Sequence, residues 1–445
     1  MATRPVHTTS EPDWMALIDD IYRGRWVIPN KGTLLPASPI RRLHLGTDLD
    51  GMEAELIASA GLSGKAAIVA DARTMDALGT RISTHLGRTD TILLEHPHAD
   101  LATVAELSER TRAYDYLIAV GSGTLNDLCK YVTAQDGRDY CVFGTAASMD
   151  GYTSSTASIT LESGLKISLP AHAPKGVFMD IGVIAAAPAF LAASGFGDCV
   201  CSSVCQVDWW MSHRLLDSFY DGGPYLLMAE DEKAVFARAA GIRTGELEAI
   251  GSLVRLLMLS GLGVAITGVS NHGSMGEHQI SHYIDCFARE RHPGTLHGEQ
   301  VGVATLTVGR IQQGLLGRSE PPVMQPTRLD EADMRRRMGP AIAEQCLAEY
   351  RKKALDQAGA ERLNARLAEI WPQLQQECAG MIRTVEDMKA LLEQAGSPTS
   401  AADLGLAVDF YREAVNHAHE MRNRYSFTDI ACNAGVLADF AAREA

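Results

Sequence analysis

The chain has 445 residues, of which 46% are hydrophobic and 21% charged, and its 55 Asp and Glu residues outnumber 40 Lys and Arg to give a formal net charge of −15. This composition is that of ordinary globular proteins and excludes a disordered chain or a coiled-coil rod. The acidic balance argues against a nucleic-acid-binding protein, which needs positive charge to displace counterions from phosphates.

The cysteines and the apolar segments indicate where the protein works. Nine cysteines are scattered through a chain long enough to bury a core without disulfide bonds, so they are expected to be reduced thiols. Residues 1–14 contain no apolar stretch like that of a secretory signal, and no run approaches ~18 consecutive apolar residues. We therefore expect a cytoplasmic protein with no membrane insertion and no nucleic-acid partner.

Short apolar runs alternate with helical patterns in the first part of the chain. Such alternation predicts a mostly parallel sheet covered by helices. The predicted strands are 65–71, 91–95, 116–120, 140–143 and a stretch within 174–184, and the predicted helices between them are 74–86 and 124–134.

The later part of the chain has helical spacing and few clusters of β-branched residues. Helical runs are predicted at 230–250, 331–358, 361–379 and 385–395. The sequence therefore predicts two domains, an α/β domain over residues 1–185 and an all-α domain over residues 186–445.

The sharpest local motif joins the strand 116–120 to the next helix. Its glycine-rich stretch 121–124 stands where the backbone must turn tightly and the helix begins. Free N–H groups and the positive end of the helix dipole suit a diphosphate there. Because Asn126 replaces the third glycine of a G-x-G-x-x-G fingerprint, the motif by itself indicates either a phosphate site or a plain strand-to-helix turn.

Asp71 ends the predicted strand 65–71, where a carboxylate is able to accept hydrogen bonds from an adenosine ribose and to repel a 2′-phosphate. This position favours NAD(H), although Arg73 offers a charge that suits NADP(H). The alternative is that Asp71 only caps the following helix.

Possible metal ligands and a polar loop complete the local signals. Asp150 lies among small hydroxyl residues directly after the strand 140–143, at the edge where α/β proteins bind ligands. His278 and His282 share one helix face, and with Asp198 and His297 they form a donor set that suits a catalytic divalent metal. A pair of histidines at this spacing also arises by accident, and spacing alone does not bring the four residues together.

These motifs, in this order, resemble those of the sn-glycerol-1-phosphate dehydrogenases, especially the bacterial AraM-type branch. That family is part of the iron-containing alcohol dehydrogenase and dehydroquinate synthase-like superfamily. The resemblance covers most of the chain and includes a segment similar to the family's C-terminal helix motif. It implies that residues 1–185 form a dinucleotide-binding domain, that residues 186–445 form a domain for metal and substrate, and that the active site lies in the cleft between them. The matching segments are 121–124, 145–151, 195–198, 276–282, 297–300 and, near the end, 421–429.

The resemblance implies a nicotinamide dinucleotide, NAD(H) or NADP(H), and one divalent metal, zinc in many members and nickel in AraM-type ones. It implies that Asp198, His278 and His297 bind the metal, that Asp150 and His282 contact the substrate, and that Asp198 reaches it too. A homo-oligomer, dimeric or larger, is expected from the family alone. The implied cofactor-binding residues, with the residue-based candidate Asp71, are Gly121, Gly123, Thr124, Leu125, Asn126, Asp127, Thr145, Ala146, Ala147, Ser148 and Ser154.

Two departures from the family pattern bear on the substrate. Members usually carry Lys four residues after the metal-binding Asp, and Arg in a Ser-Arg-Pro-Ala-Ser segment; here those positions are Ser202 and Asn271. Lys and Arg hold phosphate best. The expected reaction is the reversible reduction of dihydroxyacetone phosphate to sn-glycerol 1-phosphate. The alternatives are a dehydrogenase of an unphosphorylated or modified polyol or ketone, a sugar-phosphate cyclase, and an inert ligand-binding paralogue.

Overall fold

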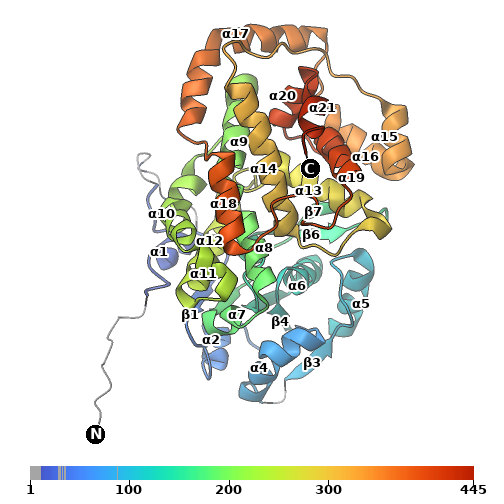
Figure 1. Ribbon diagram of the computed structural model, residues 1–445. Helices are drawn as coiled ribbons and strands as arrows, with labels where there is room; N and C mark the ends of the chain where they lie inside the picture. The colour runs from blue at the N-terminus through green and yellow to red at the C-terminus, as the bar shows by residue number, and fades with distance from the viewer. Residues whose placement is uncertain (1–11, 29–31, 33, 35–36, 88, 445) are drawn as a thin grey trace.

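A six-stranded parallel sheet forms the centre of the first half of the protein (Figure 1). The structure is a computed structural model that describes residues 12–28, 32, 34, 37–87 and 89–444. Along the sheet the strands are ordered β1-β8-β5-β4-β2-β3, and every neighbouring pair is parallel. The strands are β1 Arg42–Gly46, β2 Ala66–Ala70, β3 Asp90–Leu93, β4 Tyr116–Gly121, β5 Asp139–Gly144 and β8 Gly176–Asp180.

Helices cover both faces of this sheet, because successive side chains of a strand point to opposite faces. Ile68 and Ile118 pack in one apolar layer, and Val69 and Leu117 pack in the other. The first layer includes side chains of α2 Glu53–Ser59 and α4 Thr80–His85, and the second includes those of α5 Leu101–Thr111 and α6 Gly123–Asp136. The first half also contains the helices α1 Ile18–Tyr22, α3 Ala72–Thr74 and α7 Ile181–Ala185, a π-helical turn Met75–Gly79, and an antiparallel hairpin of β6 Thr156–Thr160 and β7 Lys166–Pro170.

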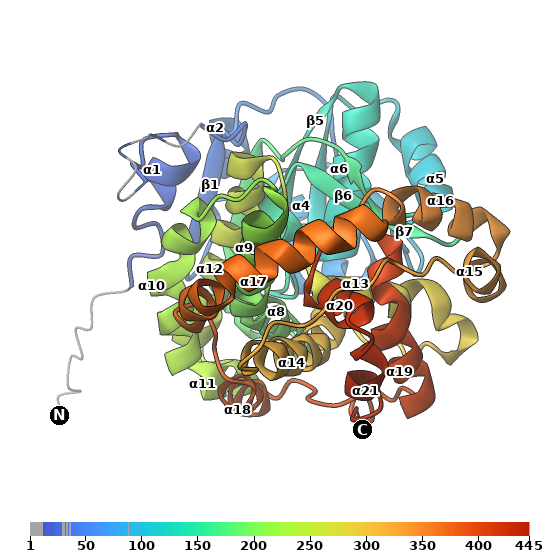
Figure 2. The same ribbon diagram turned by 90° about the horizontal axis from the view of Figure 1, so that it is seen from above.

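Among the described residues, every regular element after β8 is helical. These elements lie above the sheet in Figure 1, and α17 lies across their outer end in both views (Figure 2). They are α8 Ala189–Val200, α9 Ser202–Leu216, α10 Gly223–Ala237, α11 Ala239–Thr244, α12 Leu247–Thr267, α13 Gly276–Phe287, α14 His297–Leu316, α15 Glu331–Met338, α16 Pro340–Tyr350, α17 Gln357–Ala379, α18 Val385–Ala395, α19 Val408–His417, α20 Phe427–Asn433 and α21 Leu437–Ala441.

The predicted fold class, an α/β part followed by a helical part, is confirmed, whereas the boundary at residue 185 stays a prediction. The predicted strands are present, but the sequence analysis missed the edge strand β1 and the β6–β7 hairpin. The predicted helix 230–250 was wrong, because Gly245 with a φ of +68° ends α11 and a new helix follows. The predicted helix 331–358 was also wrong, since Gly339 and Pro340 end α15 and start α16.

The segment 421–429 is only partly helical. Arg422 has an extended backbone conformation, and α20 does not begin until Phe427. Ser426 and Asp429 form a capping box that fixes this start. Within this segment, an α-helix is therefore present only from Phe427 onward, and the family resemblance of the segment stays a prediction.

Glycines allow α8 and α14 to touch backbone to backbone. A Cβ atom added at Gly197 would overlap the carbonyl oxygen of Gly298, and one added at Gly298 would overlap that of Ser194. A Cβ at Gly195 would overlap the carbonyl oxygen of Ala147, in the loop that follows β5. The three segments therefore meet at a distance that no larger residue permits.

Two helical stretches are long and apolar enough to cross a membrane by those criteria alone, residues Ala189–Leu216 and Leu247–Thr267. Their most apolar windows are 72% and 78% buried inside the protein. Burial of this extent is what core helices show, so these stretches do not indicate a membrane protein.

The contact between α8 and α14 predicts the effect of one methyl group. Gly197→Ala should lower the free energy of unfolding by about 1–3 kcal/mol, because overpacking a rigid contact forces the backbones apart. Gly380→Ala is the matched control, since the nearest atom to its added Cβ would be 3.6 Å away and its φ is −74°. Thermal unfolding of the two variants measures the difference, and equal melting temperatures would contradict the close contact.

Candidate active site

The turn from β4 into α6 lies at the edge of a large cavity. A Cβ at Gly121 would overlap the side chain of Leu125, so the tight turn requires glycine. The first amides of α6 precede its earliest backbone hydrogen bond, from the N–H of Asn126 to the carbonyl of Ser122, and are free for an anion. Gly123, which begins α6, lines the cavity.

The buried Lys130, which the sequence analysis did not identify, forms hydrogen bonds with the loop after β5. Lys130 Nζ donates hydrogen bonds to the carbonyl oxygens of Gly151 at 2.7 Å and Thr156 at 2.9 Å, and to Ser154 Oγ at 3.1 Å. The Asp127 carboxylate lies 3.4 Å from the same ammonium. A buried charge with this many partners fixes the loop that carries Asp150 and Ser154.

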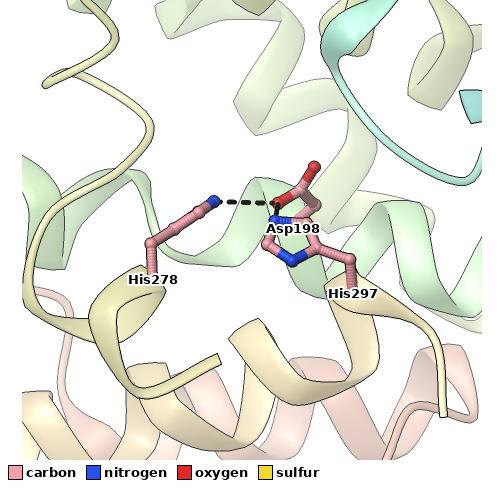
Figure 3. A group of neighbouring side chains, drawn as sticks. All are labelled: Asp198, His278 and His297. Atoms are coloured by element: carbon pink, nitrogen blue, oxygen red, sulfur yellow. Dashed lines mark ion pairs between the residues drawn. The ribbon is translucent and has the colours of Figure 1, made fainter. Parts of the chain in front are cut away.

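Three side chains from three helices converge beside the cavity (Figure 3). Asp198 Oδ1 lies 3.6 Å from His278 Nε2 and 3.9 Å from His297 Nε2. Asp198 is near the end of α8, His278 is in the first turn of α13, and His297 begins α14. The structure thus brings together the three residues that the resemblance implies as metal ligands.

Hydrogen bonds on the far side of each imidazole orient the two rings. His278 Nδ1 lies 2.7 Å from Glu277 Oε1, and His297 Nδ1 lies 3.0 Å from Ser281 Oγ, which donates in turn to Gln300. Both Nε2 atoms are therefore directed toward Asp198. Carboxylates and polar groups behind metal-binding histidines have this orienting role in known metal sites.

The electrostatics also fit a cation. Burial, together with the negative charge of Asp150, raises the pKa of Asp198 to about 7. Burial and the neighbouring His278 lower the pKa of His297 well below its usual value, which keeps that ring in the neutral form that binds metals. The set of one carboxylate and two imidazoles suits a divalent transition metal.

Asp150 and His282 lie next to this group. The backbone N–H of Asp150 donates to Asp198 Oδ2 at 3.2 Å, and its carboxylate accepts from Ser260 at 2.7 Å. His282 Nε2 lies 2.9 Å from Arg422 Nη2, while its buried Nδ1 has no hydrogen-bond partner among the described residues. Both side chains line the cavity, so each is in a position to contact a small molecule there.

The cavity has a volume of about 660 Å³ and is lined by elements of both halves of the chain. Among the residues named from the sequence, Gly123, Thr124, Asp127, Ser148, Asp150, Ser154, His278, His282 and His297 line it. The remaining ones, which do not line it, are Asp71, Gly121, Leu125, Asn126, Thr145, Ala146, Ala147 and Asp198.

Several of the residues outside the lining have structural contacts instead. Asp71 accepts a hydrogen bond from the backbone N–H of Thr74 at 2.8 Å and caps α3. Asn126 accepts from the buried Tyr140 hydroxyl at 3.2 Å. The Ala146 carbonyl accepts a hydrogen bond from Tyr152.

Neither position where the family pattern loses a cation lines the cavity. Ser202 donates to Glu232 at 2.6 Å, in a separate pocket of about 20 Å³ behind Asp198, and Asn271 lies on the loop between α12 and α13. The cations that do line the cavity, Lys166 and Arg422, were missed as functional residues. The only signal for Arg422 was its place within the matching segment 421–429.

Comparisons with known proteins identify the family of the chain. Residues 44–188 match the family model described as iron-containing alcohol dehydrogenase. The chain is 28% identical to a glycerol-1-phosphate dehydrogenase (NAD(P)+) of Bacillus velezensis, over 83% of this chain and 86% of that protein. It is 30% identical to one of Thermococcus kodakarensis, over 61% of this chain and 77% of that protein. The chain belongs to the glycerol-1-phosphate dehydrogenase family.

Membership confirms the family resemblance and makes the protein an NAD(P)-dependent dehydrogenase of a metal-containing family. A solved glycerol dehydrogenase from Schizosaccharomyces pombe is similar in structure, with a TM-score of 0.59 at 17% identity, over 91% of this chain and 90% of that one. At that identity the likeness supports the fold alone, and the fold agrees with the predicted class.

The convergence of Asp198, His278 and His297 predicts a metal-binding defect. Asp198→Asn and His297→Ala should lose bound divalent metal and ketone reduction, while keeping NADH binding, because the amides of α6 are untouched. His417→Ala, outside the cavity lining, is the control. Elemental analysis and NADH fluorescence measure the two properties; full metal occupancy in both site variants would refute the assignment.

Proposed function

We propose that the protein catalyses the reversible, NAD(P)-linked reduction of dihydroxyacetone phosphate to sn-glycerol 1-phosphate. The observation that carries this proposal is the cavity that begins at the amides of α6 and reaches the group formed by Asp198, His278 and His297. One end suits the diphosphate of a dinucleotide and the other suits a metal beside a carbonyl. The named activity of the relatives supports this choice of substrate.

The proposed cofactor site follows the two loops at the carboxyl edge of the sheet. The dinucleotide diphosphate would accept hydrogen bonds from the first amides of α6, where Gly123 and Thr124 line the cavity. Ser148 and Ser154, which also line it, belong to the loop that Lys130 holds. This arrangement directs the nicotinamide from the sheet toward the helical half.

Asp198, His278 and His297 would hold a zinc or nickel ion, for which their donor set is suitable. Such a metal supplies Lewis-acid polarisation of the substrate carbonyl. Glu277 behind one imidazole and Ser281 behind the other would hold the two rings in the orientation that metal binding needs. The carbonyl oxygen of the substrate gains negative charge during hydride transfer, and a cation held by these ligands would stabilise that charge.

Proton movement is assigned to His282, and substrate orientation to Asp150. If Arg422 donates to His282 Nε2, the proton of that neutral ring resides on Nδ1, which has no other partner among the described residues. His282 is then able to relay a proton, because Nδ1 can release its proton toward the substrate oxygen as Nε2 takes up another that solvent supplies, and the ring stays neutral. The carboxylate of Asp150, held by Ser260, would accept a hydrogen bond from a substrate hydroxyl.

A second candidate is the reduction of an unphosphorylated hydroxyketone. The observation that favours it is the absence of a cation at Ser202 and Asn271. The oligomeric state, dimeric or larger, stays an expectation from the family.

The two candidates predict different substrate preferences. If dihydroxyacetone phosphate is the substrate, its kcat/KM should exceed that of dihydroxyacetone by roughly tenfold to a hundredfold, since a charge-assisted hydrogen bond contributes ~1.5–3 kcal/mol. Absorbance of NADH at saturating metal measures both rates. An equal kcat/KM for the two ketones would favour the second candidate and leave the dehydrogenase class unchanged.

Asp71 predicts a preference for NADH over NADPH. Asp71→Ser should narrow this preference, because serine retains the helix-capping acceptor but removes the charge that would repel a 2′-phosphate. The ratio of kcat/KM for the two cofactors measures the change, with Asp100→Ser, at the cap of α5, as the matched control. A wild-type enzyme that uses NADPH equally well would overturn the prediction.

A further inference from the structure

Two arginines near the end of the chain have no carboxylate partner among the described residues. Arg422 lines the cavity, and its guanidinium is 2.9 Å from His282 Nε2. Arg424 donates to Ser270 Oγ at 2.8 Å and to the carbonyl oxygen of Ser274. By contrast, Arg337 forms ion pairs with two carboxylates. Both guanidiniums make their contacts in part-buried surroundings, with no counter-charge paired to them among the described residues.

Their closeness is unfavourable without an anion. Burial and the positive charge of Arg424 lower the pKa of Arg422, although arginine keeps its proton in proteins. Two like charges removed from water and lacking a counter-charge destabilise the folded protein. An anion in the cavity would offset this effect, and it would gain a charge-assisted hydrogen bond from Arg422.

Arg422 lines the cavity beside the histidines where the ketone would react. His282, which Arg422 contacts, is one helical turn from His278, and its ring centroid is 5.7 Å from that of His297. Arg424 holds both serines that flank the segment 271–273, so its charge lies beside the position where relatives usually carry arginine.

The other cation that lines the cavity is already neutralised. Lys166 Nζ lies 2.8 Å from Asp285 Oδ2, and that carboxylate also accepts a hydrogen bond from Gln300. The diphosphate of the cofactor would bind the backbone amides at the start of α6, on the sheet side of the cavity. Among the cavity-lining cations, Arg422 is therefore the one left for a second anion.

We propose that Arg422, supported by Arg424, binds the phosphate of a small phosphorylated hydroxyketone and replaces the cations missing at Ser202 and Asn271. This inference rests on the proposed function. Arg422 contacts the phosphate through its guanidinium fork, whereas Arg424 positions the Ser270–Ser274 loop and adds charge. Specificity for a phosphorylated substrate is thus retained through a different part of the chain.

The first test compares two ketones in each variant. Arg422→Gln should lower the ratio of kcat/KM for dihydroxyacetone phosphate to that for dihydroxyacetone by roughly tenfold to a hundredfold. The ratio cancels any effect transmitted through His282 to both ketones. Arg422→Lys should keep part of the ratio, Arg424→Gln should lower it less, and the control Arg412→Gln, whose guanidinium binds only the Glu444 carbonyl closely, should not change it.

The second test uses inorganic phosphate and does not depend on turnover. Phosphate should raise the melting temperature of the wild-type protein and of Arg412→Gln, and raise that of Arg422→Gln much less. If the wild type reduces neither ketone, the proposed function fails, and loss of phosphate stabilisation in Arg422→Gln still supports the anion site. If Arg422→Gln leaves the ratio of kcat/KM for the two ketones unchanged, the inference is overturned. In an enzyme that reduces neither ketone, it is overturned if phosphate raises the melting temperature of Arg422→Gln as much as that of the wild type. If Arg422→Gln does not fold, Arg422→Lys takes its place in both tests.

Discussion

The backbone contact between α8 and α14 is the constraint on which the rest of the site depends. Gly197 precedes Asp198, and Gly298 follows His297, so the two glycines that allow the contact are neighbours of the two side chains that it brings together. Gly195 adds the loop after β5, whose backbone N–H at Asp150 donates to Asp198. Interiors are packed too closely for a methyl group to be absorbed here without moving a ligand.

Three differently charged groups lie at different places along the cavity. The amides of α6 are at the sheet edge, the buried Asp198 with its two imidazoles is in the middle of the contact between halves, and the guanidinium of Arg422 lies on the helical side. In a region of low dielectric, a charge interacts more strongly with the groups near it than it would in water. An acidic protein is therefore able to offer positive charge locally to an anionic cofactor and an anionic substrate.

Lys130 has an equivalent role in the sheet half. It is fully buried, and its ammonium holds three groups of the segment 151–156 at hydrogen-bond distance. Two sets of hydrogen bonds therefore hold the loop that carries Asp150. Lys130 makes one set, and the backbone N–H of Asp150 donates the other bond to the carboxylate of Asp198. A mobile loop at this point would place neither the dinucleotide nor the substrate, since precise positioning contributes much of the rate in such reactions.

The sequence by itself determined the alternation of strands and helices in the first half, the helical second half, and the residue types that suit a metal and a dinucleotide. It did so because periodicity and turn residues are local properties. It did not predict β1 or the β6–β7 hairpin, and it merged helices separated by Gly245 and Gly339, because a short edge strand and a single break leave weak local signals. Only the tertiary structure decided that Asp198, His278 and His297 meet, and that Arg422 contacts His282 across 140 residues of chain. The physical reason is that these contacts depend on how closely two helices approach, which glycines and buried hydrogen bonds determine jointly and no single segment encodes.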